Sequence, residues 1–191
     1  MYLTLFKRDD IVRVPVAGGT PKKLASLPRG ILALHAGKLY AASYATGTLV
    51  ELPTAPGAGK PRPIAGRLAR PTALAVDADA AFVYCEGDQT LVRITLATGD
   101  TSVLARGLIN SDALVADGDH VYTRSWGTPK TVLRVRKDGS RPPEVLADDL
   151  ATPSRIAIDA EAIYVTSRDD GRIVRFAKSA LVINPLPAAR P

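Results

Sequence analysis

The side chains best suited to binding in this sequence lie in short polar segments between apolar ones. Aromatic and charged residues in such segments can anchor a ligand or partner, because tryptophan, tyrosine and arginine contribute most to binding surfaces. Trp126, the only tryptophan, is the strongest candidate, since it stands beside Gly127 and Pro129 in a loop one residue longer than its counterparts. The candidate binding residues are Tyr44, Arg70, Glu86, Asn110, Asp112, Trp126 and Asp169.

Four of these candidates carry oxygen atoms that could ligate a divalent cation. They are Glu86, Asn110, Asp112 and Asp169. Calcium takes six to eight oxygen ligands, and a bound cation can polarise a carbonyl or lactone oxygen. Our first interpretation is a protein without a cofactor. The alternative is a protein that binds a divalent cation such as calcium at these four residues.

Acidic residues also recur at Asp77, Asp117 and Asp159, each followed closely by a second acidic residue. Such pairs could bind calcium. Their repetition favours another role, in which the aspartate accepts N–H bonds of a tight turn that every repeat needs.

Catalytic motifs are absent from the sequence. The only histidines, His35 and His120, fall in turns expected on the face opposite the candidate loops, and neither Gly-x-Ser-x-Gly nor His-Glu-x-x-His occurs. The single cysteine, Cys85, follows an apolar segment and is expected to be buried and inert. We therefore predict no catalytic residues.

A repeat positions these residues. An aromatic residue recurs at intervals of 40 to 42 residues, and a short apolar segment follows each time. Periods of this length in short strands are typical of β-propeller blades. The aromatic positions are Tyr40, Phe82, Tyr122 and Tyr164, and Tyr2 opens a shorter copy.

The prediction is an all-β chain forming one β-propeller domain over residues 1–191, with about five four-stranded blades. The blades span approximately 1–27, 28–68, 69–109, 110–150 and 151–185, and the first lacks its inner strand. Residues 181–183 could form a last outer strand, and Pro185, Pro187 and Pro191 are expected to prevent regular pairing beyond it. The strand count fits an incomplete five-bladed ring or a piece of a larger one. Open blade edges would favour self-association.

The segments Gly30-Ile31-Leu32-Ala33-Leu34 and Ile11-Val12-Arg13-Val14-Pro15-Val16-Ala17-Gly18-Gly19-Thr20-Pro21 resemble repeats of bacterial NHL-like and TolB-like six-bladed propellers. That resemblance implies loops around a channel mouth on one face. They enter each inner strand or join the second and third strands, and they carry the candidate residues.

The composition argues against two classes of partner, nucleic acids and membranes. The formal charge of +6 comes from scattered lysines and arginines, and the chain has ten aromatic residues, which argues against nucleic-acid binding. No apolar run reaches the eighteen or so residues of a membrane helix, and no export signal is visible. As written the chain is expected to be cytoplasmic, or exported if an N-terminal segment is missing.

Two functions follow from these features. The first is a non-enzymatic interaction module that recognises a protein, peptide or glycan through its loops. The alternative is a metal-dependent enzyme resembling the gluconolactonase or virginiamycin B lyase propellers, acting on a small molecule at the channel mouth.

Overall fold

The computed structural model describes residues 1–180 and 184–185 and shows an all-β chain, as predicted. Within this part, the one helix is the short 3-10 turn η1 (Lys178–Ala180), and no helix is long and apolar enough to cross a membrane. The strands are β1 (Tyr2–Leu5), β2 (Asp10–Arg13), β3 (Lys22–Ser26), β4 (Gly30–His35), β5 (Lys38–Ser43), β6 (Thr48–Leu52), β7 (Arg62–Ala65), β8 (Pro71–Val76), β9 (Ala80–Cys85), β10 (Thr90–Thr95), β11 (Thr101–Ala105), β12 (Leu114–Asp117), β13 (His120–Ser125), β14 (Thr131–Arg136), β15 (Glu144–Ala147), β16 (Pro153–Ile158), β17 (Ala162–Ser167), β18 (Arg172–Ala177) and β19 (Asn184–Pro185).

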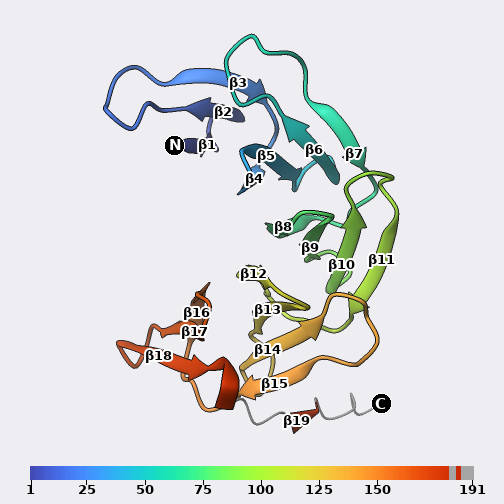
Figure 1. Cartoon of the computed structure of the whole chain (residues 1–191), viewed down its shortest axis with the longest axis vertical. Coiled ribbons are helices and arrows are strands. Elements are labelled where there is room, and N and C mark those ends of the chain that lie inside the picture. Colours follow the sequence, from blue (N-terminus) through green and yellow to red (C-terminus); the bar gives the residue numbers. More distant parts are fainter. Residues whose placement is uncertain (181–183, 186–191) are drawn as a thin grey trace.

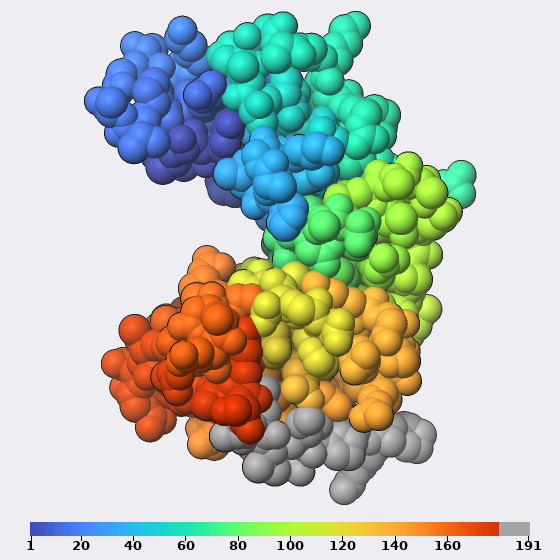
Figure 2. Space-filling model, in the orientation of Figure 1, coloured from blue at the N-terminus to red at the C-terminus, as the bar shows by residue number. Residues whose placement is uncertain are grey.

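Five antiparallel sheets fan out in an arc, with β4, β8, β12 and β16 toward its centre (Figure 1). The sheets are β1–β3, β4–β7, β8–β11, β12–β15 with β19, and β16–β18. The first and fifth sheets lie at the two ends of the arc, and the space-filling view shows the opening between them (Figure 2). The described residues therefore form an incomplete ring.

The two end sheets differ from the middle three. The first has three strands, with β1 at its inner edge and no strand inside it among the described residues, as predicted. The fifth also has three, and the outer strand expected at 181–183 lies outside the described residues. Asn184 and Pro185 pair with Val145 and Glu144 at the outer edge of the fourth sheet, so the expectation that Pro185 excludes pairing was wrong. Proline is tolerated there because an edge strand needs ladder bonds on one side only.

A cluster of apolar side chains fills each contact between successive sheets, which we call a seam. The repeated aromatic residue contributes to three seams, with Tyr40, Phe82 and Tyr122 exposed by 4%, 0% and 3%. Both faces of a middle sheet are covered, so its inner strands are apolar on both sides instead of alternating. This packing fixes the loops at the strand ends.

Apolar residues stay exposed at the two ends of the arc. Leu3 in the first sheet is 39% exposed, whereas its counterpart Val83 is fully buried. Ile173 in the fifth sheet is 73% exposed, whereas its counterpart Val132 is fully buried. We call these two surfaces the end faces.

Candidate functional site

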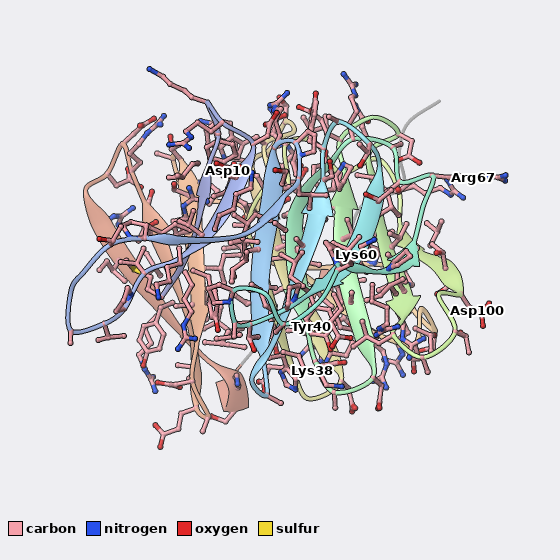
Figure 3. The ribbon with its side chains drawn as sticks, turned by 90° about the horizontal axis from the view of Figure 1, so that it is seen from above. Asp10, Lys38, Tyr40, Lys60, Arg67 and Asp100 are labelled. Carbon is pink, nitrogen blue, oxygen red and sulfur yellow. The ribbon has the colours of Figure 1, made fainter. Side chains whose placement is uncertain are left out.

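The loops that enter each inner strand meet the turns between the second and third strands on one side of the arc, which we call the loop face. The same type of backbone hydrogen bond joins them in four sheets: Tyr44 N to Arg29 O (3.4 Å), Glu86 N to Arg70 O (3.0 Å), Trp126 N to Ile109 O (2.7 Å) and Arg168 N to Thr152 O (2.9 Å). Figure 3 shows the arc from above, with Arg67 of a strand-entry loop on one side and Lys38 of the β4–β5 hairpin on the other. All seven predicted residues lie in the segments of the loop face.

Tyr44 and Glu86 come from neighbouring sheets and meet directly. The Tyr44 hydroxyl donates to Glu86 Oε2 at 3.2 Å. The Arg29 guanidinium carbon lies 3.9 Å from the centre of the Tyr44 ring, within range of a cation–π interaction. Arg29 reaches this position from a backbone with φ of 49° at the entry to β4.

Trp126 is half-buried on the fourth sheet and lies close to two arginines. The guanidinium carbons of Arg124 and Arg168 lie 4.3 Å and 5.9 Å from its ring centre. Its indole N–H donates to Pro153 O at 2.8 Å, which ties the ring to the fifth sheet. The ring is therefore held in one orientation, as a rigid binding anchor should be.

Arg124 holds this group together although it is 4% exposed. It donates to Asn110 O at 2.8 Å, to Ser154 O at 3.0 Å and to the Asp112 carboxylate. We call Trp126, Arg124, Asp112 and Arg168 the tryptophan cluster. Asn110 contributes only its carbonyl oxygen to these contacts.

The tryptophan cluster contains two arginines and one aspartate, and the charges around Arg124 shift its pKa in opposite directions. Burial lowers the pKa of Arg124, Asp112 opposes that lowering, and Arg155 and Arg168 add to it. Arg124 still carries its proton at neutral pH, as arginine does throughout proteins. Asp112 is therefore the carboxylate that directly balances the buried charge of Arg124, while the positive charges of Arg155 and Arg168 act against it.

Asp169 contacts the tryptophan cluster through the adjacent residue Arg168. Its carboxylate accepts a hydrogen bond from the Thr152 hydroxyl and lies 3.4 Å from Arg168 Nε. The hydrogen bond from Thr152 lowers the pKa of Asp169, with Arg168 and Lys130 contributing. Arg70 is exposed on the loop face, and within the described residues its side chain makes none of these contacts.

A hollow of about 190 Å³ opens where the inner strands begin. Its walls are mainly apolar, and Asp112 and Arg155 are its charged residues. Asp112 therefore connects the hollow to the tryptophan cluster. The lining includes Ile31, Thr72, Leu74, Asp112, Leu114, Arg155 and Ile156.

The structure does not gather the residues proposed as cation ligands. Glu86 accepts from Tyr44, Asp112 from Arg124 and Asp169 from Thr152, so the carboxylates have separate partners. Over residues 1–180 and 184–185, no three His, Cys, Asp or Glu side chains are close enough to hold a metal ion.

The opposite face carries the recurrent aspartates. Asp77 Oδ1 accepts from the N–H groups of Asp79 (3.1 Å) and Ala80 (2.9 Å), and Asp159 makes the equivalent bonds to Glu161 and Ala162 (both 2.8 Å). The turn role is thus confirmed for these two residues. Asp117 instead accepts from Lys178 of the next sheet.

Sequence reasoning missed Arg124. Its counterparts in the repeat are Ala42, Tyr84 and Thr166, so a charged residue stands where the other copies carry neutral ones. This charged residue at a neutral repeat position is the sequence feature that could have identified Arg124 as a candidate site residue.

No protein-family model matches the chain, and no curated protein matches its sequence. Among solved structures 137 chains match. One comes from the crystal structure of a nidogen/laminin complex, with a TM-score of 0.65 and 18% identity, covering 88% of this chain and 74% of that one. This likeness and the five sheets define the fold as an all-β protein of the β-propeller type.

Proposed function

We propose that this chain is a β-propeller binding module, of the NHL-like or TolB-like kind, that recognises a protein segment with its loop face. The observation that carries the proposal is the tryptophan cluster. It combines tryptophan and arginine, the residue types that most often dominate interface energetics, on a scaffold that fixes their positions.

Two further observations support it. Tyr44 with Arg29 forms a second aromatic–arginine pair on the same face, so contacts are available over several sheets. One of the similar solved chains comes from a complex between two proteins, nidogen and laminin. No comparable observation supports the lactonase-like or lyase-like alternative, because the carboxylates proposed as its metal ligands each bond to a different protein group.

Affinity capture from an extract of the source cells, quantified by mass spectrometry, tests the proposal. We expect Trp126→Ala to reduce the captured partner by about thirtyfold, since removing a central tryptophan typically costs about 2 kcal/mol of binding. Arg168→Ala, at an exposed residue, is a second variant less prone to disturb folding. Lys38→Ala on the opposite face is the matched control and should capture as the wild type does.

A partner that every one of these variants retains equally would contradict the proposal. Circular dichroism and thermal melting of each variant identify any loss that reflects unfolding. Calorimetry with calcium, magnesium, manganese and zinc tests the metal-dependent alternative on the same protein.

A further inference from the structure

Most acidic side chains of the loop face are occupied by bonds within the protein, and the exposed Asp148 and Asp149, in the loop entering β16, are the exceptions among the described residues. Six carboxylates on this face each accept at least one hydrogen bond or ion pair from a neighbouring group. Their donors are Arg29 N for Asp9, Tyr44 for Glu86, Thr90 for Asp88, Arg124 for Asp112, Thr152 for Asp169 and Ser167 for Asp170. These groups have little capacity left for a cationic ligand.

Several arginines of the same face, in contrast, have no strong partner within the described part of the protein. Within residues 1–180 and 184–185, the side chains of Arg29, Arg70 and Arg155 donate no hydrogen bond to a protein group and pair with no carboxylate. Arg168 pairs only with the adjacent Asp169, at 3.4 Å and with both side chains more than half exposed. Such an exposed pair is weak and exchanges readily for another anion.

The segments that carry these arginines adjoin the hollow. Arg29 and Arg70 lie in the loops entering β4 and β8, whose second residues Ile31 and Thr72 line the hollow, and Arg155 lines it directly. Arg168 lies beside the tryptophan cluster, which reaches the hollow through Asp112. One of the four arginines, Arg155, therefore lines the hollow, and the other three lie on the same face in segments of the second, third and fifth sheets.

Guanidinium groups suit one class of ligand especially well. Their planar fork matches a carboxylate with two parallel hydrogen bonds, and stacking on an aromatic ring orients the fork in advance. Arg29 on Tyr44 and Arg168 near Trp126 have this support. The two rings are already covered by guanidinium groups, so they are poor platforms for stacking bases, which single-stranded nucleic acids require.

We infer that the loop face binds an acidic peptide segment, whose Asp or Glu carboxylates pair with Arg29, Arg70, Arg155 and Arg168 around the hollow. This inference rests on the proposed function and specifies the chemistry of its partner. The apolar walls of the hollow take the aliphatic part of one such side chain.

Trp126 provides the readout, because it is the only tryptophan and belongs to the cluster. Hexaglutamate, which carries no aromatic group, is titrated into the protein while tryptophan fluorescence is recorded. We expect a saturable change that weakens as salt is added. In Arg155→Gln/Arg168→Gln the affinity should fall by about tenfold, as two partly exposed ion pairs are lost. Lys38→Gln, which removes one positive charge on the opposite face, is the control and should bind as the wild type does.

Three outcomes would overturn the inference: an equal response to hexalysine, affinity unchanged in the double variant, or tighter binding of oligothymidylate than of hexaglutamate. The last would assign the arginines to phosphate. If hexaglutamate fails to bind while capture of a protein partner still depends on Trp126, the proposed function stands and the acidic ligand does not.

Discussion

Arg124 shows how one buried charge can organise a surface. Its guanidinium joins Asn110 and Asp112, which precede β12, to Ser154 at β16 and supports the Trp126 ring from below. Three acceptors would be left without their donor if the side chain were shortened. Burying such acceptors without a partner is costly.

We predict that Arg124→Met lowers the free energy of unfolding by about 2 kcal/mol, because two backbone carbonyl oxygens and the partly exposed Asp112 lose their donor. Urea denaturation measures the change, and the emission of Trp126 should shift in the folded variant. Arg168→Met, at an exposed arginine beside the same ring, should lie within about 1 kcal/mol of wild type. Equal losses in the two variants would show that Arg124 has no special structural role.

Cys85 confirms the sequence-based prediction of a buried thiol, with 2% exposure. Burial raises its pKa to about 11. We predict that the native protein reacts negligibly with a thiol reagent at pH 8, whereas the urea-unfolded chain reacts fully, as absorbance of the released thiolate would show. Because the folded pKa is the higher one, the associated stability is present below the ordinary thiol pKa of 9.0 and is lost as pH rises toward 11. Rapid modification of the native protein would contradict the burial.

At the scale of elements, the sequence predicted the strands well, because each seam repeats the same residue types at nearly fixed spacing. It predicted the first sheet without an inner strand, since Tyr2 aligns with the aromatic residue of the second strand in every later copy. It did not predict the pairing of Asn184–Pro185 with β15, because a two-residue edge contact has no pattern of its own. The candidate loops were assigned to one face, but the contacts within it depend on rotamers that spacing does not specify.

A lysine of one sheet pairs with an aspartate of the preceding sheet at two seams. Lys137 Nζ lies 2.7 Å from Asp77 Oδ2, and Lys178 pairs with Asp117. Both side chains of the first pair are less than one third exposed. This contact therefore stabilises the seam more than a fully exposed ion pair would.

We predict a coupling of about 1 kcal/mol between Asp77→Asn and Lys137→Met in a double-mutant cycle of unfolding free energies. Burial by itself raises the pKa of Asp77, but the hydrogen bonds from Lys137 and from the N–H groups of Ala80 and Asp79 bring it below its usual value. A lowered folded pKa gives stability that is present above the unfolded pKa of 3.8 and is lost as pH falls through the lower, folded pKa. Asp77→Asn should therefore reduce the slope of stability against pH on the acid side. An unchanged slope would show that Asp77 does not titrate with unfolding.

At the scale of the whole molecule, the open arc leaves apolar end faces in contact with water. Leu3 and Ile173 are both exposed there, although the equivalent positions of middle sheets are buried. Exposed apolar surface and the edge of β1, which pairs with no strand of residues 1–180 or 184–185 on its inner side, both favour contact with another protein surface.

We predict that light scattering finds a mass above the 20.2 kDa of one chain as concentration rises. Leu3→Glu combined with Ile173→Glu should restore a monomer, because charges on the end faces resist burial. Val103→Glu, at an exposed aliphatic residue of the outer strand β11, controls for the added negative charge. A wild-type chain that stays monomeric at every concentration would show that the end faces do not associate.

The lysine–aspartate pairs also determine the order in which the sheets can follow one another. Where an inner strand ends in Asp77 or Asp117, the next sheet supplies a lysine, and where it ends in His35, the next sheet carries Leu96 at the corresponding position. Exchanging the third and fourth sheets in the chain would set Asp77 against Lys178 but leave Lys137 beside His35. The third, fourth and fifth copies are thus alike in shape but not interchangeable, because the two lysine–aspartate pairs match each of these sheets to its neighbour.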